Sequence, residues 1–364
     1  MKTLKLTNTN HKQLITETCK VLEAGGLVIY PTETVYGIGV DATNHSAVEK
    51  LIRYKSRREG KPLSIAVADT SMAQKFIQLS PQAQDLHQRF LPGPYTIVSK
   101  GKQTVAPHVE SEFGTLGIRI PDYSLILDLV KKFDKPITAT SANASGKKRP
   151  YTVQDIFDRL SEKQKNLIDL VIDAGKLPPN EPSIVIDTTL TTPLTVRGNF
   201  DHQTPTQKFS TNSDLETRDL AGKLTLKNWE KIKKTGIIIG LNGELGTGKT
   251  VFTQGIAKFL QITEPLSSPT YTYMNQYDFN RHNVTGTLNH LDVWKIDSKE
   301  SFDLLEIPQL IKPGTITVIE WWQQIAGYWP NALPITFQAT LTEPNISSSS
   351  NPNHREITIF ENEN

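Results

Sequence analysis

The chain has 364 residues, 37% of them hydrophobic and 21% charged, which is the composition of a globular protein and excludes a disordered or membrane-embedded one. Forty basic residues against 38 acidic ones leave a net charge of +2, so no overall positive field draws the chain to nucleic acid or lipid. The single cysteine, Cys19, excludes an internal disulfide and a cysteine-rich metal site. The length favours two domains.

Neither a signal peptide nor a membrane span is evident. The N-terminus, MKTLKLTNTNHKQ, is polar and has no apolar stretch of signal-peptide length. No run approaches the ~20 apolar residues that a membrane-spanning helix needs. We therefore expect a cytoplasmic protein without contact to a membrane.

Strand-like and helix-like segments alternate in the first 200 residues. Two amphipathic patterns, at 45–55 and 81–91, predict helices. Short apolar runs predict strands at 27–30, 63–67, 95–99, 115–120, 137–140 and 183–188. The alternation predicts an α/β domain with a twisted sheet as its core.

A polar stretch, NFDHQTPTQKFSTNSD, interrupts the apolar periodicity at 199–214. Polar and turn-forming residues without a period are typical of a connection. We interpret its central part, 201–212, as a linker between a first domain, 1–200, and a second, 213–364.

The second domain again combines helices and strands. Near its C-terminus, two strand-like runs flank the polar stretch EPNISSSSNPNH, which predicts a hairpin with a long loop at 343–354. The predicted helices are 215–224 and 251–260, and the predicted strands are 236–241, 334–341 and 355–360.

A glycine-rich loop, GELGTGKT, spans residues 243–250 and matches the phosphate-binding pattern G-x-x-x-x-G-K-[ST]. It follows a predicted buried strand and precedes a predicted helix, as this pattern requires. Its glycines let the backbone curl so that N–H groups face a phosphate, and the helix N-terminus adds its positive end. Lys249 can then reach the β- and γ-phosphates, and Thr250 can join a Mg²⁺ shell. The loop predicts binding of a nucleoside triphosphate with Mg²⁺.

Two carboxylates end later apolar runs, Asp292 in LNHLDVW and Glu320 in TITVIEWW. At strand ends they would lie near the phosphate loop, where one could orient water and the other hold the metal. The alternative is an edge-strand or capping role. Thr270, in SSPTYTY, could sense a γ-phosphate or simply form a turn.

The order of GELGTGKT, SPTYT, HLDVW and IEWWQ resembles the TsaE (YjeE) family of small P-loop ATPases over about residues 211–345. The resemblance implies a small P-loop NTPase α/β fold in which Asp292 assists hydrolysis, Thr270 lies in a switch-like loop and Trp321 helps to close the site. It implies that Thr250 and Glu320 ligate Mg²⁺. ATP would bind the loop residues Gly243, Glu244, Leu245, Gly246, Thr247, Gly248, Lys249 and Thr250. The family supports the TsaB and TsaD proteins, which make N6-threonylcarbamoyladenosine in tRNA, so these partners are implied, with tRNA reached through them.

The first domain carries no nucleophile beside a base, and its conspicuous side chains are cationic or bear hydroxyls. YKSRREGKPL places Lys55, Arg57, Arg58 and Lys61 at a predicted helix end and the turn beyond it. Cations suit a helix C-terminus, so a solvated basic face is one interpretation. A polyphosphate clamp is the other.

Two further turns follow predicted strands. PTETVYGIG, 31–39, places Thr32 in a bend, and its two glycines allow close backbone approach. ATSANASGKKR, 139–149, crowds Ser141 and Asn143 into a turn. Small hydroxyls and amides at strand ends commonly line an α/β ligand cleft, although ordinary turn chemistry is the alternative.

The segments YKSRREGKPL, PTETVYGIG and ATSANASGKKR occur together with LPGPYT, GTLGIRIPD, SIVID and VRGN. In this combination the chain resembles the YrdC/TsaC family, the L-threonylcarbamoyladenylate synthases, over about residues 10–200. The resemblance implies that the amine of L-threonine takes up bicarbonate or CO₂, and that the carbamate attacks the α-phosphate of ATP and releases pyrophosphate. Threonine would be held by Thr32, Ser183 and Arg119, the last facing its carboxylate. ATP would be held by Lys55, Arg57, Thr115, Ser141, Asn143 and Arg197. Such chemistry needs positioning and charge neutralisation, so Lys55, Arg57, Ser141 and Asn143 are the catalytic candidates.

Three positions depart from the family pattern. Lys61 stands where many relatives carry Asn, Ala66 where longer relatives carry a threonine-contacting His, and Arg149 where a small hydroxyl residue is common. These departures bear on affinity and leave the reaction class unchanged.

The two resemblances together predict a bifunctional protein of tRNA threonylcarbamoyladenosine biosynthesis. The alternative is an RNA-binding ATPase switch with a catalytically silent YrdC-like module, in which KSRREGK and GKKR contact phosphates. The near-zero net charge argues against this alternative.

Overall fold

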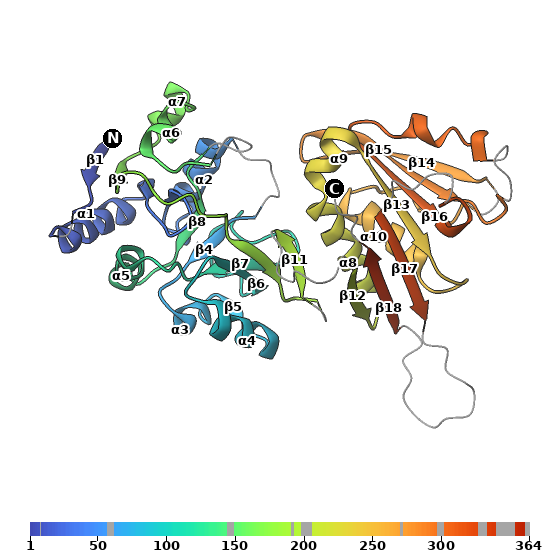
Figure 1. Ribbon diagram of the computed structural model, residues 1–364, viewed down its shortest axis with the longest axis horizontal. Coiled ribbons are helices and arrows are strands. Elements are labelled where there is room, and N and C mark those ends of the chain that lie inside the picture. The colour runs from blue at the N-terminus through green and yellow to red at the C-terminus, as the bar shows by residue number, and fades with distance from the viewer. Residues whose placement is uncertain are drawn as a thin grey trace. The chain divides into compact units, whose positions relative to one another are not determined.

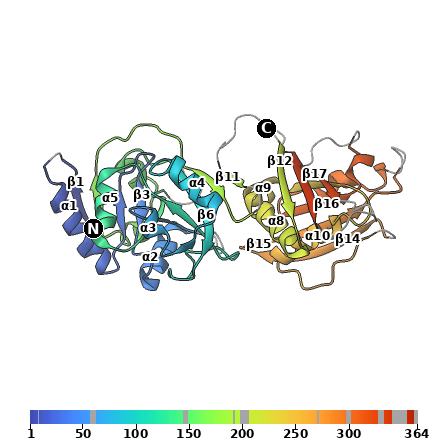
Figure 2. The same cartoon turned by 90° about the horizontal axis from the view of Figure 1, so that it is seen from below.

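The computed structural model describes residues 1–364 except 8, 57–61, 144–148, 191–192, 198–205, 270–271, 297–301, 327–332, 340–353 and 361–364. The chain divides into two compact units, residues 1–200 without 190–192, and residues 201–364 with 190–192. Both combine helices with a sheet (Figures 1 and 2). Within the described ranges, no helix is long and apolar enough to cross a membrane.

The first unit is built on an 11-stranded sheet with the order β1-β9-β2-β3-β8-β4-β7-β6-β10-β11, and β5 pairs with β6. Its strands are β1 (Lys2–Lys5), β2 (Val28–Tyr30), β3 (Gly37–Gly39), β4 (Ser64–Ala66), β5 (Ile77–Gln78), β6 (Tyr95–Gly101), β7 (Thr115–Arg119), β8 (Ile137–Ser141), β9 (Leu170–Asp173), β10 (Ile184–Asp187) and β11 (Leu194–Arg197). Its helices are α1 (His11–Glu23), α2 (His45–Lys55), α3 (Thr70–Ala73), α4 (Pro81–Phe90), α5 (Ser124–Phe133), α6 (Val153–Phe157) and α7 (Glu162–Lys165).

All predicted strands and both predicted helices of this unit are confirmed. Helix α2 begins where its pattern does, because the Asn44 side chain accepts the backbone N–H of Ala47 and caps the first turn. Helix α1 was not predicted, because its buried stripe, Leu14, Cys19 and Leu22, is interrupted by many polar residues.

The second unit contains a seven-stranded sheet with the order β12-β18-β17-β13-β16-β15-β14. Its strands are β12 (Thr206–Thr211), β13 (Ile237–Asn242), β14 (Met274–Arg281), β15 (Val284–Asp292), β16 (Thr315–Glu320), β17 (Leu333–Ala339) and β18 (Arg355–Phe360). Its α-helices are α8 (Asp214–Lys227), α9 (Trp229–Thr235) and α10 (Lys249–Phe259). Strands β15, β16, β13 and β17 run parallel, and β14, β18 and β12 are antiparallel to their neighbours.

The helices and strands predicted for this unit are confirmed, including the antiparallel pair β17 and β18, whereas the predicted loop at 343–354 lies mostly outside the described residues. The second half of the predicted linker, 201–212, contains a strand. Strand β12 lies there and places buried Phe209 opposite Ile357 of β18. One apolar residue among polar ones suffices for an edge strand, and this is too weak a pattern to recognise.

Candidate active sites

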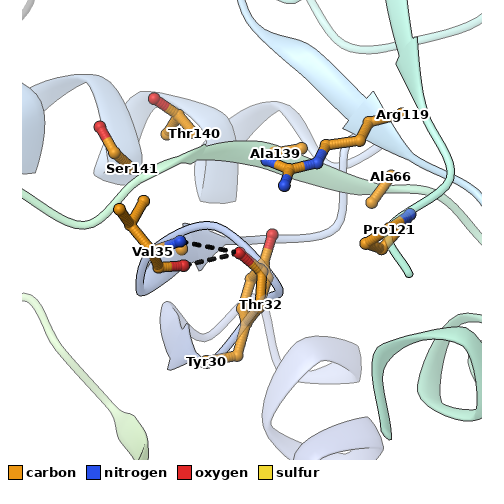
Figure 3. A pocket seen from close by; sticks show the side chains of 10 residues that line it. Tyr30, Thr32, Val35, Ala66, Arg119, Pro121, Ala139, Thr140 and Ser141 are labelled. Carbon is orange, nitrogen blue, oxygen red and sulfur yellow. Dashed lines mark hydrogen bonds between the residues drawn. The ribbon is translucent and has the colours of Figure 1, made fainter. Parts of the chain in front are cut away.

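A pocket lies on one face of the first unit's sheet, over β3, β8, β4 and β7 (Figure 3). Its empty space is about 280 Å³, including open solvent at its mouth. Arg119 reaches over it from the end of β7, and the turn after β2 forms its opposite wall. The lining residues are Tyr30, Thr32, Val35, Gly37, Ala66, Arg119, Pro121, Ala139, Thr140 and Ser141.

The turn after β2 is organised by the hydroxyl of Thr32, which is 4% exposed. Its Oγ1 donates to the Val35 carbonyl at 2.7 Å and accepts the Val35 backbone N–H at 3.3 Å (Figure 3). It also accepts the backbone N–H of Thr34 at 3.2 Å. A threonine side chain that bonds its own turn in this way fixes the backbone locally. The predicted substrate residue is therefore also the residue that shapes the pocket wall.

Arg119 is tied to this same turn. Its Nη2 donates to Glu33 Oε1 at 2.8 Å and to Thr34 Oγ1 at 2.7 Å. The side chains of Arg119 and Glu33 are 13% and 16% exposed. The guanidinium is thereby held in the pocket by two residues that the sequence analysis did not single out.

Strand register aligns two of the predicted ATP residues. Ser64 of β4 lies opposite Gly117 of β7 on one side and Ala139 of β8 on the other. Thr115 and Ser141 each lie two residues beyond these partners toward the same edge, and side chains two apart share a face. Thr115 and Ser141 are thus level with each other, on the face that carries the pocket.

Lys55 ends α2 and is 3% exposed. Its ammonium donates to the carbonyl oxygens of Ser141 and Asn143 at 2.7 and 2.5 Å. The neighbouring Tyr54 hydroxyl donates to the Ala142 carbonyl at 2.6 Å. The end of α2 therefore fixes the turn after β8, in which Ser141 Oγ also donates to Asn143 Oδ1 at 2.5 Å.

Ser183 and Arg197 form a second polar group in this unit. Arg197 donates through Nε to the Ser183 carbonyl at 3.0 Å and through Nη2 to Ser183 Oγ at 2.7 Å. Burial lowers the pKa of Arg197, and the positive charges of Arg119 and Arg149 lower it further. Two further arginines close enough to Arg197 to lower its pKa mark a region suited to anions.

The positions that depart from the family pattern have separate outcomes. Ala66 lines the pocket, and Arg149 is half-exposed and pairs with Glu181 at 3.0 Å. Arg57, Arg58 and Lys61 lie outside the described residues. Of the four cations of the hypothetical polyphosphate clamp, the structure therefore describes only Lys55. The predicted close approach at Gly37 exists, but the approaching group is the Tyr30 ring, 2.8 Å from where a Cβ would stand.

In the second unit, the loop between β13 and α10 has the conformation of a phosphate cradle. Gly243, Gly246 and Gly248 have φ angles of 138°, 80° and 103°, which L side chains rarely adopt. Gly248 also faces Arg355 of β18, whose Nε would stand 2.5 Å from an added Cβ. Glycine is therefore required at this position both by the backbone and by packing.

Lys249 is 4% exposed and donates to the carbonyl oxygens of Gly243 and Glu244, both at 2.8 Å. Its Nζ lies 4.4 Å from the centre of the Trp321 ring, which is a cation–π contact. Burial lowers the pKa of Lys249, and the carboxylates of Glu320 and Asp292 act in the opposite direction. Trp321 has φ 63° without being glycine, a strained conformation of the kind that concentrates at functional sites.

Both predicted carboxylates lie beside the loop. Asp292 of β15 stands opposite Glu320 of β16, which stands opposite Leu241 of β13, just before the loop. Thr250 Oγ1 donates to Glu320 Oε1 at 3.0 Å, and Ser268 Oγ donates to Asp292 Oδ2 at 3.3 Å. Thr270 lies outside the described residues.

The donor set beside the loop fits Mg²⁺. A hydroxyl and a carboxylate in contact are hard oxygen ligands, and Mg²⁺ at nucleotide sites takes one or two such groups together with phosphates and water. Among the described residues there is no group of three or more His, Cys, Asp or Glu that could hold a metal without a nucleotide. Thr250 and Glu320 are therefore the residues that would hold Mg²⁺ beside a bound triphosphate.

Three polar residues at these sites were missed. Glu33 stands beside Thr32 in a quoted motif, and its acidity next to a predicted ligand is the signal that could have found it. His290, two residues before Asp292, shares a buried contact of 2.9 Å with Glu320. Arg355 packs against Gly248 and donates to Asp214 Oδ1 at 2.6 Å. It lies 107 residues after Gly248 in the sequence, so no local pattern indicates that the two are in contact.

Two family models match the chain. Residues 20–198 match the Sua5/YciO/YrdC model, described as "Telomere recombination". Residues 211–349 match the model described as "Threonylcarbamoyl adenosine biosynthesis protein TsaE". The two matches follow each other along the chain, as the sequence analysis predicted.

Curated relatives match the first unit. A Methanocaldococcus jannaschii protein, provisionally named a threonylcarbamoyl-AMP synthase, is 37% identical over 186 residues, which cover 51% of this chain and 86% of that protein. The threonylcarbamoyl-AMP synthases of Pyrococcus abyssi and Bacillus subtilis are 33% and 35% identical over 48% and 44% of this chain. The chain spans about half the length of these two, 51% and 47%. These names favour the synthase interpretation over the RNA-binding alternative.

Among solved structures, Pyrococcus abyssi Sua5 complexed with L-threonine matches with a TM-score of 0.50 and 21% identity, over 87% of this chain and 91% of that one. A variant of the same protein matches with a TM-score of 0.50 and 24% identity, over 71% and 85%. At these identities the likeness supports the fold alone.

Proposed function

This chain belongs to the Sua5/YciO/YrdC family through its first unit and carries a TsaE domain in its second, and on this premise we propose how each unit works. The first unit makes L-threonylcarbamoyladenylate from L-threonine, bicarbonate or CO₂, and ATP. The second hydrolyses ATP to support transfer of the threonylcarbamoyl group to adenosine 37 of tRNA. Both steps belong to the biosynthesis of one modified nucleoside. Because tRNA is a cytoplasmic substrate, we expect the protein to act in the cytoplasm.

The observation that supports the synthase most directly is the pocket that brings Thr32, Arg119 and Ser141 together from three distant segments. Arg119 supplies a forked cation for the threonine carboxylate. Ser183 lies next to Arg197 and would complete the threonine contacts from the other side. The pocket therefore has the groups needed to bind a small zwitterion beside a phosphate site.

Carbamate formation first joins the threonine nitrogen to the carbon of CO₂, and the nitrogen loses a proton. The adenylation step that follows makes one bond and breaks one. An oxygen of the threonine carbamate bonds to the α-phosphorus of ATP, and the bond between that phosphorus and the β-phosphate oxygen breaks to release pyrophosphate. The residues hold the two reactants in line and offset the negative charge that gathers on the phosphates. Arg197, Ser141 and Asn143 would do this directly. Lys55 would act by fixing the turn that presents Ser141 and Asn143.

In the second unit the loop at 243–250 would bind the ATP phosphates, and Lys249 would exchange its two carbonyl partners for phosphate oxygens. Mg²⁺, held by Thr250 and Glu320, would offset phosphate charge. Asp292, which is 3% exposed at the adjacent strand end, would orient the attacking water. Thr270 and Trp321 would complete the site. We expect TsaB and TsaD to be the partners that use the product and that present tRNA.

Pyrophosphate release tests the synthase proposal. The full chain carrying Lys249→Ala is supplied with ATP, Mg²⁺ and bicarbonate, with and without L-threonine, so that phosphate from the second unit does not interfere. We expect pyrophosphate to form only with threonine. Threonine-independent release, or none from folded protein that binds ATP, would contradict the proposal.

A further inference from the structure

The carboxylate of Glu33 contacts Arg119, a residue that lines the pocket, and has no role in the function proposed so far. It accepts one hydrogen bond from Arg119 Nη2 at 2.8 Å, and its backbone carbonyl accepts a bond from Asn180 Nδ2 at 2.7 Å. The side chain is 16% exposed. Glu33 is thus held in place from two directions beside the guanidinium that faces the pocket.

The ion pair leaves hydrogen-bonding capacity unused. Within the described part of the chain, the second carboxylate oxygen of Glu33, Oε2, and the Nε–H of Arg119 are buried and have no hydrogen-bond partner. Buried polar atoms normally have partners, so an unsatisfied acceptor next to an unsatisfied donor needs an explanation. A ligand that carries a cationic donor and an anionic acceptor on the same carbon would satisfy both.

The charges near the pocket also favour a role for Glu33 in binding a cationic group. Arg119 and Arg149 are both close enough to Arg197 to lower its pKa. A cluster of guanidinium groups attracts carboxylates and phosphates and repels an ammonium group. Glu33 is a partly buried acid in contact with one of these cations, whereas Glu181, which pairs with Arg149, is 82% exposed.

We propose that Glu33 binds the α-ammonium group of the amino-acid substrate, so that Glu33 and Arg119 together select a zwitterion over a simple carboxylate. This assignment rests on the proposed synthase function of the first unit. Arg119 takes the α-carboxylate through its Nε–H, and Glu33 takes the α-ammonium through Oε2. Glu33 is then a specificity-determining residue for the amino-acid substrate.

The test compares two ligands that differ at one group. L-threonine and its 2-hydroxy analogue, 2,3-dihydroxybutyrate, share the carboxylate and the side chain, but the analogue has a hydroxyl where threonine has the ammonium. Calorimetric titration of the full-length protein gives both affinities. A hydrogen bond to a charged group predicts a preference for threonine of about 10- to 100-fold in the unmodified protein.

Glu33→Gln should weaken threonine binding by about 10- to 100-fold and leave binding of the analogue nearly unchanged, because only the ammonium loses its charged partner. Glu33→Asp, which keeps the charge, should retain a preference for threonine. Glu162→Gln is the matched control, since it removes an ion-paired carboxylate that is 81% exposed. A ratio of two affinities measured on one sample does not depend on the fraction of folded protein.

Two outcomes would overturn the assignment while leaving the synthase intact. Equal weakening of both ligands by Glu33→Gln would mean that Glu33 only holds Arg119. Tighter threonine binding by that variant would mean that Glu33 competes with the substrate carboxylate. If instead the unmodified protein binds no threonine and releases no threonine-dependent pyrophosphate, the proposed function fails and the assignment fails with it.

Discussion

Each unit buries a lysine at its candidate site, and the two lysines are held alike. Lys55 donates to two main-chain carbonyls of the turn after β8, and Lys249 donates to two main-chain carbonyls of the loop before α10. The partners of Lys55 lie 86 and 88 residues away, whereas those of Lys249 lie six and five residues away. One site is assembled by the sheet, and the other is assembled within a single loop.

This difference has physical consequences. A local loop can exchange its lysine contacts for phosphate contacts without disturbing the sheet. Lys55 joins α2 to β8, so removal of its bonds affects the packing of the first unit as well as its chemistry. Both lysines should be essential for activity, but only Lys55 should matter strongly for stability.

The largest expected effect comes from Lys249→Ala. ATP hydrolysis by the second unit should fall about 1,000-fold. The reason is that Lys249 is the only cation in the loop at 243–250, all of which the structure describes, that can reach the phosphates. Threonine-dependent pyrophosphate release should stay within twofold, or about 0.4 kcal/mol. Measuring ADP and pyrophosphate in the same reaction checks both statements. Lys258→Ala, an exposed lysine on the same helix, is the control, and a loss of both activities in folded protein would contradict separate sites.

Lys55→Met sharpens the comparison from the other side. It keeps the length of the side chain but leaves two carbonyls without this donor, so the first unit should lose about 2 kcal/mol of unfolding free energy. Pyrophosphate release should fall about 100-fold because the turn that carries Ser141 and Asn143 loosens. Denaturant unfolding and the pyrophosphate assay measure these effects. Arg53→Met, a change at an exposed position of α2, should alter neither the unfolding free energy nor the rate of pyrophosphate release. A stable but inactive Lys55→Met protein would show that Lys55 acts only on substrate.

Arg119→Lys keeps the charge and removes the planar fork. We expect the KM for threonine to rise about 10-fold, while the KM for ATP changes little, because a lysine has no Nε–H to donate to the carboxylate while its terminal nitrogen contacts Glu33 and Thr34. Steady-state kinetics with each substrate varied in turn provides the measurement. A rise in the KM for ATP alone would move Arg119 from the threonine site to the nucleotide site.

The smallest effects concern two glycines. At Gly248, alanine would meet Arg355 and adopt a φ of 103°, which should cost about 1–3 kcal/mol of stability. At Gly37, alanine would meet only the Tyr30 ring at 2.8 Å, which should cost about 1–2 kcal/mol. Thermal unfolding of both variants tests the order. A larger loss at Gly37 would contradict the view that backbone conformation constrains the loop more than packing constrains the pocket.

The same contrast explains what could be predicted from the sequence. The loop at 243–250 and its flanking strand and helix were predictable because all their determinants are local. The positions of Asp292 and Glu320 were also predictable, since parallel strands bring their carboxyl ends to one edge. The hairpin of β14 and β15 was not, because its two-residue turn, His282 and Asn283, has positive φ angles without a glycine to signal it.

The first site could not be derived from local patterns. Thr32 and Arg119 are joined through Thr34, which hydrogen-bonds to Thr32 and, 85 positions away in the sequence, to Arg119. Nothing in either segment specifies the other, and only the strand order brings them together. The family resemblance supplied these residues, and it could not supply Glu33, because a carboxylate beside an arginine acquires meaning only from the contact between them.

The most direct test of the account is the identity of the product made by the first unit alone. The Lys249→Ala protein is incubated with ¹⁴C-bicarbonate, L-threonine, ATP and Mg²⁺, and the nucleotides are separated immediately by chromatography. We predict one new labelled nucleotide that contains carbon from bicarbonate, threonine and AMP, formed in equal amount to pyrophosphate. Folded protein that binds ATP but yields no labelled nucleotide would contradict the central claim that this chain makes the activated threonylcarbamoyl group itself.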